Sequence, residues 1–132
     1  MAITANESIT DHFTLRECRC PCCQRIRIGD ILFRHMEKLE TARQRLGFAI
    51  VINSGYRCLE HNKAIGGSKG SWHMDFATDA RPGWSGGVDD DEFIRRLGAM
   101  HGMALELIFG GIEKHSTFIH LDTRPILWRS VK

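Results

Sequence analysis

A helical hydrophobic pattern occupies residues 30–46. Its apolar residues recur at spacings that place them on one face of a helix: Leu32, Met36, Leu39 and Leu46. Asp30 can cap the start of this helix, and Gly47 can end it. The pattern therefore predicts an amphipathic helix over residues 30–46.

Two shorter elements are expected after this helix. The apolar run Phe48–Ile52 predicts a buried strand that is broken at Asn53-Ser54-Gly55. The segment Leu59–Ala64 then predicts a short helix that ends at Gly66.

The last third of the chain predicts one more helix and two strands. The run Asp89-Asp90-Asp91 is typical of a helix start, and Gly102 is expected to end this helix. Three of its apolar residues are expected to face inward: Phe93, Leu97 and Met100. Strands are expected over Leu105–Phe109 and Thr117–Asp122, and the tail Arg124–Lys132 is expected to pack over the sheet.

The composition is that of an ordinary globular chain. With 132 residues, 42% of them hydrophobic and 26% charged, it predicts one domain over residues 1–132 with mixed α and β elements. A net charge of +2 without a long basic block gives no argument for a nucleic-acid partner. No apolar run approaches the roughly 18 residues of a membrane span, so no membrane partner is expected. We also expect a monomer. The N-terminus has neither a basic start nor an apolar core, so no signal peptide is expected and synthesis is expected in the cytoplasm.

Two histidines and an aspartate have the composition of a catalytic zinc site. His73 follows a glycine-rich loop, Asp79 closes a short apolar stretch, and His120 lies in a predicted strand. A structural zinc site is usually closed by four ligands, whereas a catalytic site leaves one position for water, whose pKa the ion lowers to about 7. A single histidine is more often an ordinary core or surface residue, so the prediction rests on the set together with the nearby Arg57 and Ser71.

Several separated phrases of the sequence carry a family resemblance almost from end to end. They are His12–Glu17 with the cysteines that follow, Ser54–Asn62, Gly66-Gly67, Ser71-x-His73, Ala77-x-Asp79, and His120–Arg124 with Trp128. In this order they resemble the zinc D-alanyl-D-alanine carboxypeptidases, including phage-encoded and short bacterial members, whose fold is shared with the signalling domain of hedgehog proteins. The resemblance implies a single α+β domain in which helices flank a small antiparallel sheet.

The resemblance also implies an activity and a set of site residues. His73, Asp79 and His120 would hold Zn²⁺, Arg57 would bind the substrate carboxylate, and Ser71 would help to hold it. The expected reaction is hydrolysis of an amide bond in peptidoglycan stem peptides, by a carboxypeptidase or an endopeptidase acting on the cell wall, in phage lysis or as part of a virion. The alternative is a non-catalytic, metal-containing module that binds the wall or builds part of a phage.

One spacing departs from the family pattern. The family phrase S-x-H-x-x-G-x-A-x-D places histidine and aspartate seven positions apart, whereas His73 and Asp79 are six apart with no glycine between them. Asp79 keeps the alanine two positions before it and remains the expected ligand. Asp75 is the weaker alternative.

Hydrolysis also requires a general base within hydrogen-bond reach of the attacking water. Asp122 is the first choice, because residues two apart on a strand point to the same face and Asp122 therefore shares the face of His120. A carboxylate in this position can instead orient the imidazole of a metal ligand. Glu113 and His115, expected on the loop before this strand, are the alternatives.

The cysteines form a separate group. Cys18, Cys20, Cys22 and Cys23 lie close together in the sequence, and Cys58 stands alone downstream. The C-x-x-C spacing of Cys20 and Cys23 is compatible with a zinc knuckle or a redox pair. Because a second C-x-x-C is missing and five thiols suit no disulfide framework, reduced cysteines that are inert or loosely paired are the favoured interpretation.

Overall fold

The structure is a computed structural model that describes residues 7–83, 87–101, 109–124 and 128–131. Its centre is a five-stranded sheet in the order β1-β2-β4-β3-β5, in which the first four strands are antiparallel and β5 runs parallel to β3. The strands are β1 (Ile50–Ser54), β2 (Thr78–Pro82), β3 (Gly111–Lys114), β4 (Ile119–Asp122) and β5 (Trp128–Val131). The prediction of an α+β domain with a small antiparallel sheet is confirmed.

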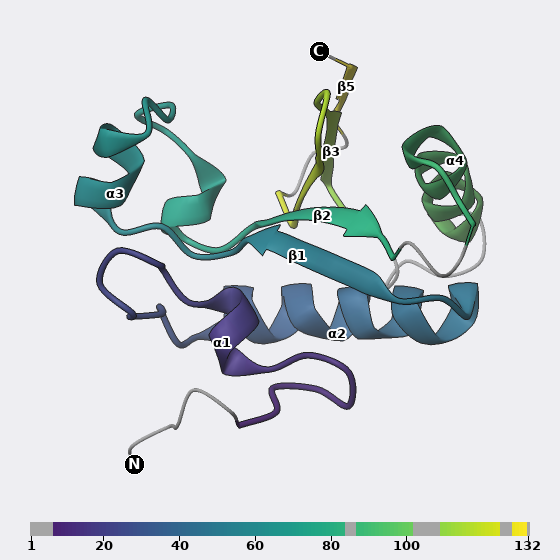
Figure 1. Cartoon of the computed structure of the whole chain (residues 1–132), viewed down its shortest axis with the longest axis horizontal. Helices are drawn as coiled ribbons and strands as arrows, with labels where there is room; N and C mark the ends of the chain where they lie inside the picture. The colour runs from purple at the N-terminus through teal and green to yellow at the C-terminus, as the bar shows by residue number, and fades with distance from the viewer. Residues whose placement is uncertain (1–6, 84–86, 102–108, 125–127, 132) are drawn as a thin grey trace.

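Helices flank this sheet, as expected. They are α1 (Leu15–Cys18), α2 (Asp30–Leu46), α3 (Leu59–Ala64) and α4 (Asp90–His101), together with the 3₁₀ turn η1 (Trp72–Met74). Figure 1 shows α2 running along one side of the sheet beneath β1, with α4 and α3 near opposite ends of the sheet. No helix in the described ranges is both long and apolar enough to cross a membrane.

Helix α2 has the predicted bounds. Leu32, Met36 and Leu39 are fully or almost fully buried, which confirms the apolar face, and Gly47 ends the helix in the left-handed conformation at φ +76°. The capping prediction was wrong: Gly29 is the N-cap and Asp30 is the first helical residue. Asp30 still lies in the first turn, where a carboxylate interacts favourably with the helix dipole.

The other two predicted helices are also present. Helix α3 has the predicted bounds, and α4 begins at Asp90, where Asp89 Oδ1 accepts a hydrogen bond of 2.8 Å from the backbone N–H of Glu92. Phe93 and Leu97 are buried as expected. Gly102 and the side chain of Met100 lie outside the described residues.

The strand predictions were less accurate. The run Phe48–Ile52 is displaced by two residues relative to β1, and β1 is half-buried rather than buried, with Val51 49% exposed. Most of the predicted strand Leu105–Phe109 lies outside the described residues, and Phe109 precedes β3. The segment 128–131 forms β5 beside β3 instead of packing over the sheet.

The two faces of the sheet differ in chemistry because successive side chains alternate between them. Ala80, Ile112, Ile119 and Leu121 belong to one hydrophobic core with Leu32, Met36 and Leu39 of α2. The residues between them on the three central strands are charged or titratable: Asp79, Glu113, His120 and Asp122. The polar face of the sheet therefore carries the candidate site.

Candidate metal centre and cleft

Strand pairing places three candidate residues in one row across the sheet. Asp79 of β2 pairs with His120 of β4, and His120 pairs on its other side with Glu113 of β3. Directly paired residues of antiparallel strands project to the same face and lie within contact distance. The sheet thus brings Asp79 beside His120, which lies 41 positions later in the sequence. Glu113 lies on strand β3, so the expectation of a loop position for it was wrong.

His73 reaches this row from the turn η1. Ser71 caps the turn, since its Oγ accepts a hydrogen bond of 3.2 Å from the backbone N–H of His73. The ring Nδ1 of His73 lies 2.7 Å from the carbonyl oxygen of Gly55, which can only accept. Nδ1 must therefore carry the proton, and the lone pair of Nε2 points toward Asp79.

The ring of His120 is also oriented by an acceptor that binds one of its two nitrogens. Its Nε2 lies 2.7 Å from Oδ2 of Asp122, which confirms that the two side chains share a face of β4. The carboxylate fixes the proton on Nε2, and Nδ1 presents its lone pair to Asp79 and His73.

Three ligand atoms converge as a result. Asp79 Oδ1 lies 2.9 Å from His73 Nε2 and 3.3 Å from His120 Nδ1, and the two ring nitrogens are 3.2 Å apart. Lone pairs at these distances repel one another unless a proton or a cation lies between them. Around a tetrahedral zinc ion with bonds of about 2.0 Å, neighbouring ligand atoms are about 3.3 Å apart. The donor set and its spacing therefore fit a metal ion.

The electrostatics of the cluster also favour a cation. Burial alone would raise the pKa of Asp79, but hydrogen bonds with His120 and His73 hold this pKa below its usual value. Burial alone would lower the pKa of His120, but Asp122 and Asp79 raise it. Both shifts have one cause, the close approach of carboxylates and imidazoles, so a negative charge on Asp79 and a positive charge beside it, from a proton or a metal ion, stabilise each other.

Asp75, the alternative ligand, lies away from this cluster. Its carboxylate pairs with Arg27 at 2.8 Å, and its side chain is 46% exposed.

Arg57 lies against the same centre. Its Nη2 donates to Oδ2 of Asp79 at 3.2 Å, and its Nη1 donates to Oδ1 of Asn62 at 3.3 Å. The side chain is only 13% exposed, yet it lines the cleft beside Ser71. Arg57 thus contacts the carboxylate oxygen of Asp79 that does not face the two histidines.

Asp122 is buried, and both of its carboxylate oxygens accept hydrogen bonds. Besides His120, it accepts hydrogen bonds from the Arg124 side chain and from the Arg124 backbone N–H, the latter at 3.0 Å. Burial would raise the pKa of Asp122, but its bonds with Arg124 and His120 lower it. Gly111, opposite in β3, leaves room for this arrangement, because a Cβ there would lie 2.4 Å from Asp122 Oδ1.

A cleft of about 720 Å³ opens beside the three converging side chains. Its walls include His73, Asp79, His120, Arg57, Ser71, Glu113, His115 and Arg124. Asp122 does not line this cleft, whereas Glu113 does. Oε1 of Glu113 pairs with Nε2 of His115 at 2.7 Å, and the His115 ring stacks on Phe118 with centroids 4.3 Å apart.

The sequence did not reveal the roles of two residues at this site. Arg124 belongs to one of the family phrases, and its side chain donates hydrogen bonds to Asp122 and lies over the Trp72 ring, 5.5 Å from the ring centroid. The carbonyl of Gly55 orients His73, and a backbone group gives no signal in a sequence. The close approach of Gly55 to the backbone of Cys18, where a Cβ would lie 2.4 Å from the Cys18 oxygen, explains why a glycine stands there.

Comparison with known proteins identifies the family. A family model described as Peptidase M15 matches residues 11–122, which include every residue of the cluster and its hydrogen-bond partners. No curated protein and no solved structure matches the chain. Since the family match covers most of its length, the chain belongs to the peptidase M15 family.

Proposed function

We propose that this member of the peptidase M15 family is a zinc-dependent peptidase that hydrolyses an amide bond in peptidoglycan stem peptides. The observation that carries the proposal is the convergence of Asp79, His73 and His120 at the wall of a cleft that also holds a carboxylate and two arginines. Such a cleft can bind a peptide whose end carries a negative charge.

His73, Asp79 and His120 are the proposed ligands of the zinc ion. When bound, the ion would polarise the scissile carbonyl and lower the pKa of water in the open position. The protein holds both imidazoles in the required tautomers through Gly55 and Asp122.

Glu113 is the proposed general base. It lies beside His120 in the pairing of β3 and β4 and lines the cleft, so its carboxylate can accept a proton from an attacking water. The same group can return the proton to the nitrogen that leaves when the amide bond breaks. Asp122, the first choice from the sequence, has its oxygens engaged by Arg124 and His120, and we assign it the task of orienting His120. His115 contacts Glu113 and would hold its carboxylate in place.

Arg57 and Ser71 are the proposed substrate-binding residues. A guanidinium can donate two parallel hydrogen bonds to a carboxylate, which a lysine cannot. Arg57 lines the cleft next to the zinc ligand Asp79, so a carboxylate held there would lie close to the scissile bond. Ser71, whose hydroxyl caps η1, lines the same part of the cleft.

The direct test is incubation of the zinc-loaded protein with purified muropeptides, followed by mass spectrometry. We expect cleavage that a chelator abolishes and zinc restores. Release of a single terminal D-amino acid would identify a carboxypeptidase, and cleavage of cross-linked dimers would identify an endopeptidase. Intact muropeptides that nevertheless bind the zinc-loaded protein would refute the proposal in favour of a wall-binding or phage structural module.

A further inference from the structure

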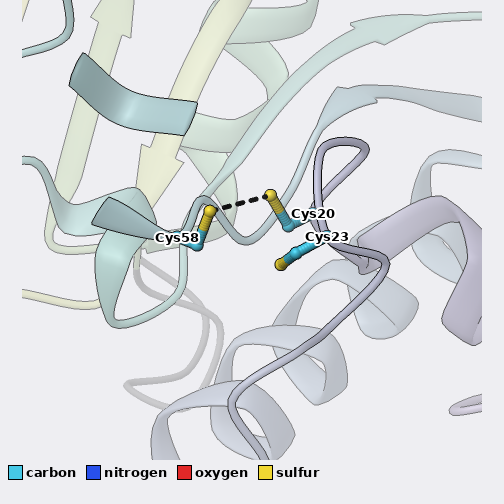
Figure 2. A group of neighbouring side chains, drawn as sticks. All are labelled: Cys20, Cys23 and Cys58. Atoms are coloured by element: carbon cyan, nitrogen blue, oxygen red, sulfur yellow. Dashed lines mark hydrogen bonds between the residues drawn. The ribbon is translucent and has the colours of Figure 1, made fainter. Parts of the chain in front are cut away.

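A second group of metal-binding side chains lies outside the cleft. The thiols of Cys20, Cys23 and Cys58 come from two distant segments, and their sulfur atoms all lie within 4.8 Å of one another. The sulfur atoms of Cys20 and Cys58 are 3.7 Å apart. Figure 2 shows the Cys20 side chain directed toward Cys58, with Cys23 beside it on the same loop.

One of these sulfur atoms accepts a hydrogen bond from the backbone. Cys58 is the N-cap of α3, and its sulfur accepts from the N–H of His61 at 3.4 Å. Donors of this kind stabilise the thiolate form, and the thiolate is the form that binds metal ions.

The loop that carries Cys20 and Cys23 is held in a tight turn. The backbone N–H of Gln24 donates to the carbonyl of Cys20, and the N–H of Cys20 donates to the carbonyl of Arg25, both at 2.8 Å. Gln24 adopts φ +60°, a conformation that side chains other than glycine rarely take. The turn places the two thiols of a C-x-x-C pair on the same side, facing Cys58.

Nearby Cys18 provides an internal comparison. It is fully buried, its thiol contacts the sulfur of Met36 at 3.8 Å, and burial raises its pKa to about 12. Cys20 is also buried, but its sulfur lies 3.7 Å from that of Cys58 and belongs to the group of three converging thiols. Cys18 is therefore a core residue, whereas Cys20 is one of a set of thiols that can hold a metal ion.

We propose that Cys20, Cys23 and Cys58 form a structural zinc site. Thiolates from a C-x-x-C turn and a distant third cysteine are typical ligands of structural zinc. The fourth position would be filled by Cys22, the exposed cysteine of the same loop, or by water. This inference does not depend on the proposed peptidase activity.

The site would join the N-terminal segment to the loop that supports the metal centre in the cleft. Cys58 follows Arg57 directly, and the backbone N–H of Tyr56 donates to the carbonyl of Cys18 at 2.8 Å. Gly55, in the same loop, accepts the hydrogen bond from His73. A zinc ion on the cysteines would therefore fix the segment 55–58, which orients one ligand of the cleft and contacts a second.

Cobalt substitution tests the site without any use of activity. The reduced protein carrying His73→Ala and His120→Ala, which lacks two of the proposed ligands in the cleft, is titrated with Co²⁺ under anaerobic conditions. We expect an intense near-ultraviolet thiolate-to-cobalt charge-transfer band that saturates at about one ion per chain. Cys20→Ser or Cys58→Ser should abolish or strongly weaken the band, and Cys18→Ala is the matched control that should retain it. Circular dichroism of each variant establishes that it is folded.

Two results would overturn the site. One is the absence of a charge-transfer band in the wild type and in the double histidine variant. The other is a disulfide between Cys20 and Cys58 in the purified protein, found by non-reducing peptide mapping, that persists when the protein is prepared with zinc. Neither result bears on the muropeptide assay, so the proposed peptidase and the proposed structural site can fail separately.

Discussion

Replacement of Asp122 by asparagine separates the two tasks that a carboxylate near the metal centre can perform. Asp122 accepts from His120 Nε2 at 2.7 Å and from Arg124 Nε at 2.8 Å, and it is completely buried. Asparagine has the same shape, but one of its two positions donates instead of accepting. If that amide faces His120, the imidazole changes tautomer and places a proton on Nδ1, where the metal ligand's lone pair should be.

The magnitude follows from the hydrogen bond that is lost. A hydrogen bond to a charged group contributes about 1.5–3 kcal/mol, which corresponds to a weakening of zinc binding by about tenfold to 150-fold. This agrees with the 10–100-fold that is typical for partners of a metal-bound histidine. Turnover at saturating zinc should stay largely intact in Asp122→Asn. In contrast, Glu113→Gln should retain zinc but lose a factor of about 10²–10⁴ in turnover, the usual contribution of a general base.

The assay combines zinc affinity from competition with a chromophoric chelator and turnover of a defined stem peptide at saturating zinc. Asp75→Asn is the matched control, because this carboxylate is half-exposed and lies outside the cleft. His115→Ala, measured in parallel, should lower turnover less than Glu113→Gln if it only holds Glu113. A large loss of turnover in Asp122→Asn with normal zinc affinity, together with a nearly normal Glu113→Gln, would refute this division of roles.

Three further predictions concern other parts of the molecule. His73→Ala and His120→Ala should each lower the bound metal by about one equivalent relative to the wild type, because two remaining ligands retain zinc poorly; unchanged metal in both would place the ion elsewhere. Arg57→Lys should weaken capture of a substrate with a free terminal carboxylate by about 1–3 kcal/mol, measured as kcat/KM against the corresponding amide substrate, and an equal loss on both substrates would contradict carboxylate binding. Burial alone would raise the pKa of Glu40, but the nearby Thr10 hydroxyl and the hydrogen bonds with His12 and Gln44 lower this pKa to about 2; the stabilising effect of Glu40 should be complete above the unfolded pKa of about 4.5 and be lost as the pH falls through 2. The Tm difference between the metal-free wild type and Glu40→Gln should therefore shrink over this range, and a constant difference would show that the charge of Glu40 is irrelevant.

Long periodic elements were predictable from the sequence, and short strands were not. Helix α2 has its predicted bounds for two reasons. Apolar residues recur at helical spacing along its whole length, which is a strong signal, and Gly47 ends the helix in a conformation that glycine favours. Strand β1 was displaced because Phe48 is buried before the strand begins, so an apolar run and a strand do not coincide. The strand β5 pairs with β3 over residues 128–131, a partnership that depends on tertiary contacts and not on local propensity.

The candidate metal ligands could be named from residue type and family phrases, but their geometry could not. The prediction that His120 and Asp122 share a face needed only the two-residue period of a strand, and the contact of 2.7 Å confirms it. The position of Glu113 beside His120 depends on the pairing of β3 with β4, which the sequence does not specify, and the same pairing sets Gly111 opposite Asp122. The choice among candidate bases therefore required the structure.

The shortened step between His73 and Asp79 can be understood from what fixes each end of it. Asp79 is fixed by its pairing with His120 in the sheet, and His73 is fixed by the cap of Ser71 and the carbonyl of Gly55. Neither position depends on the length of the connection between them. Within that connection Phe76 is completely buried in the core, so a side chain anchors a segment in which the family pattern has a glycine. The missing residue therefore changes the connection, while the ligand atoms at its two ends still lie 2.9 Å apart.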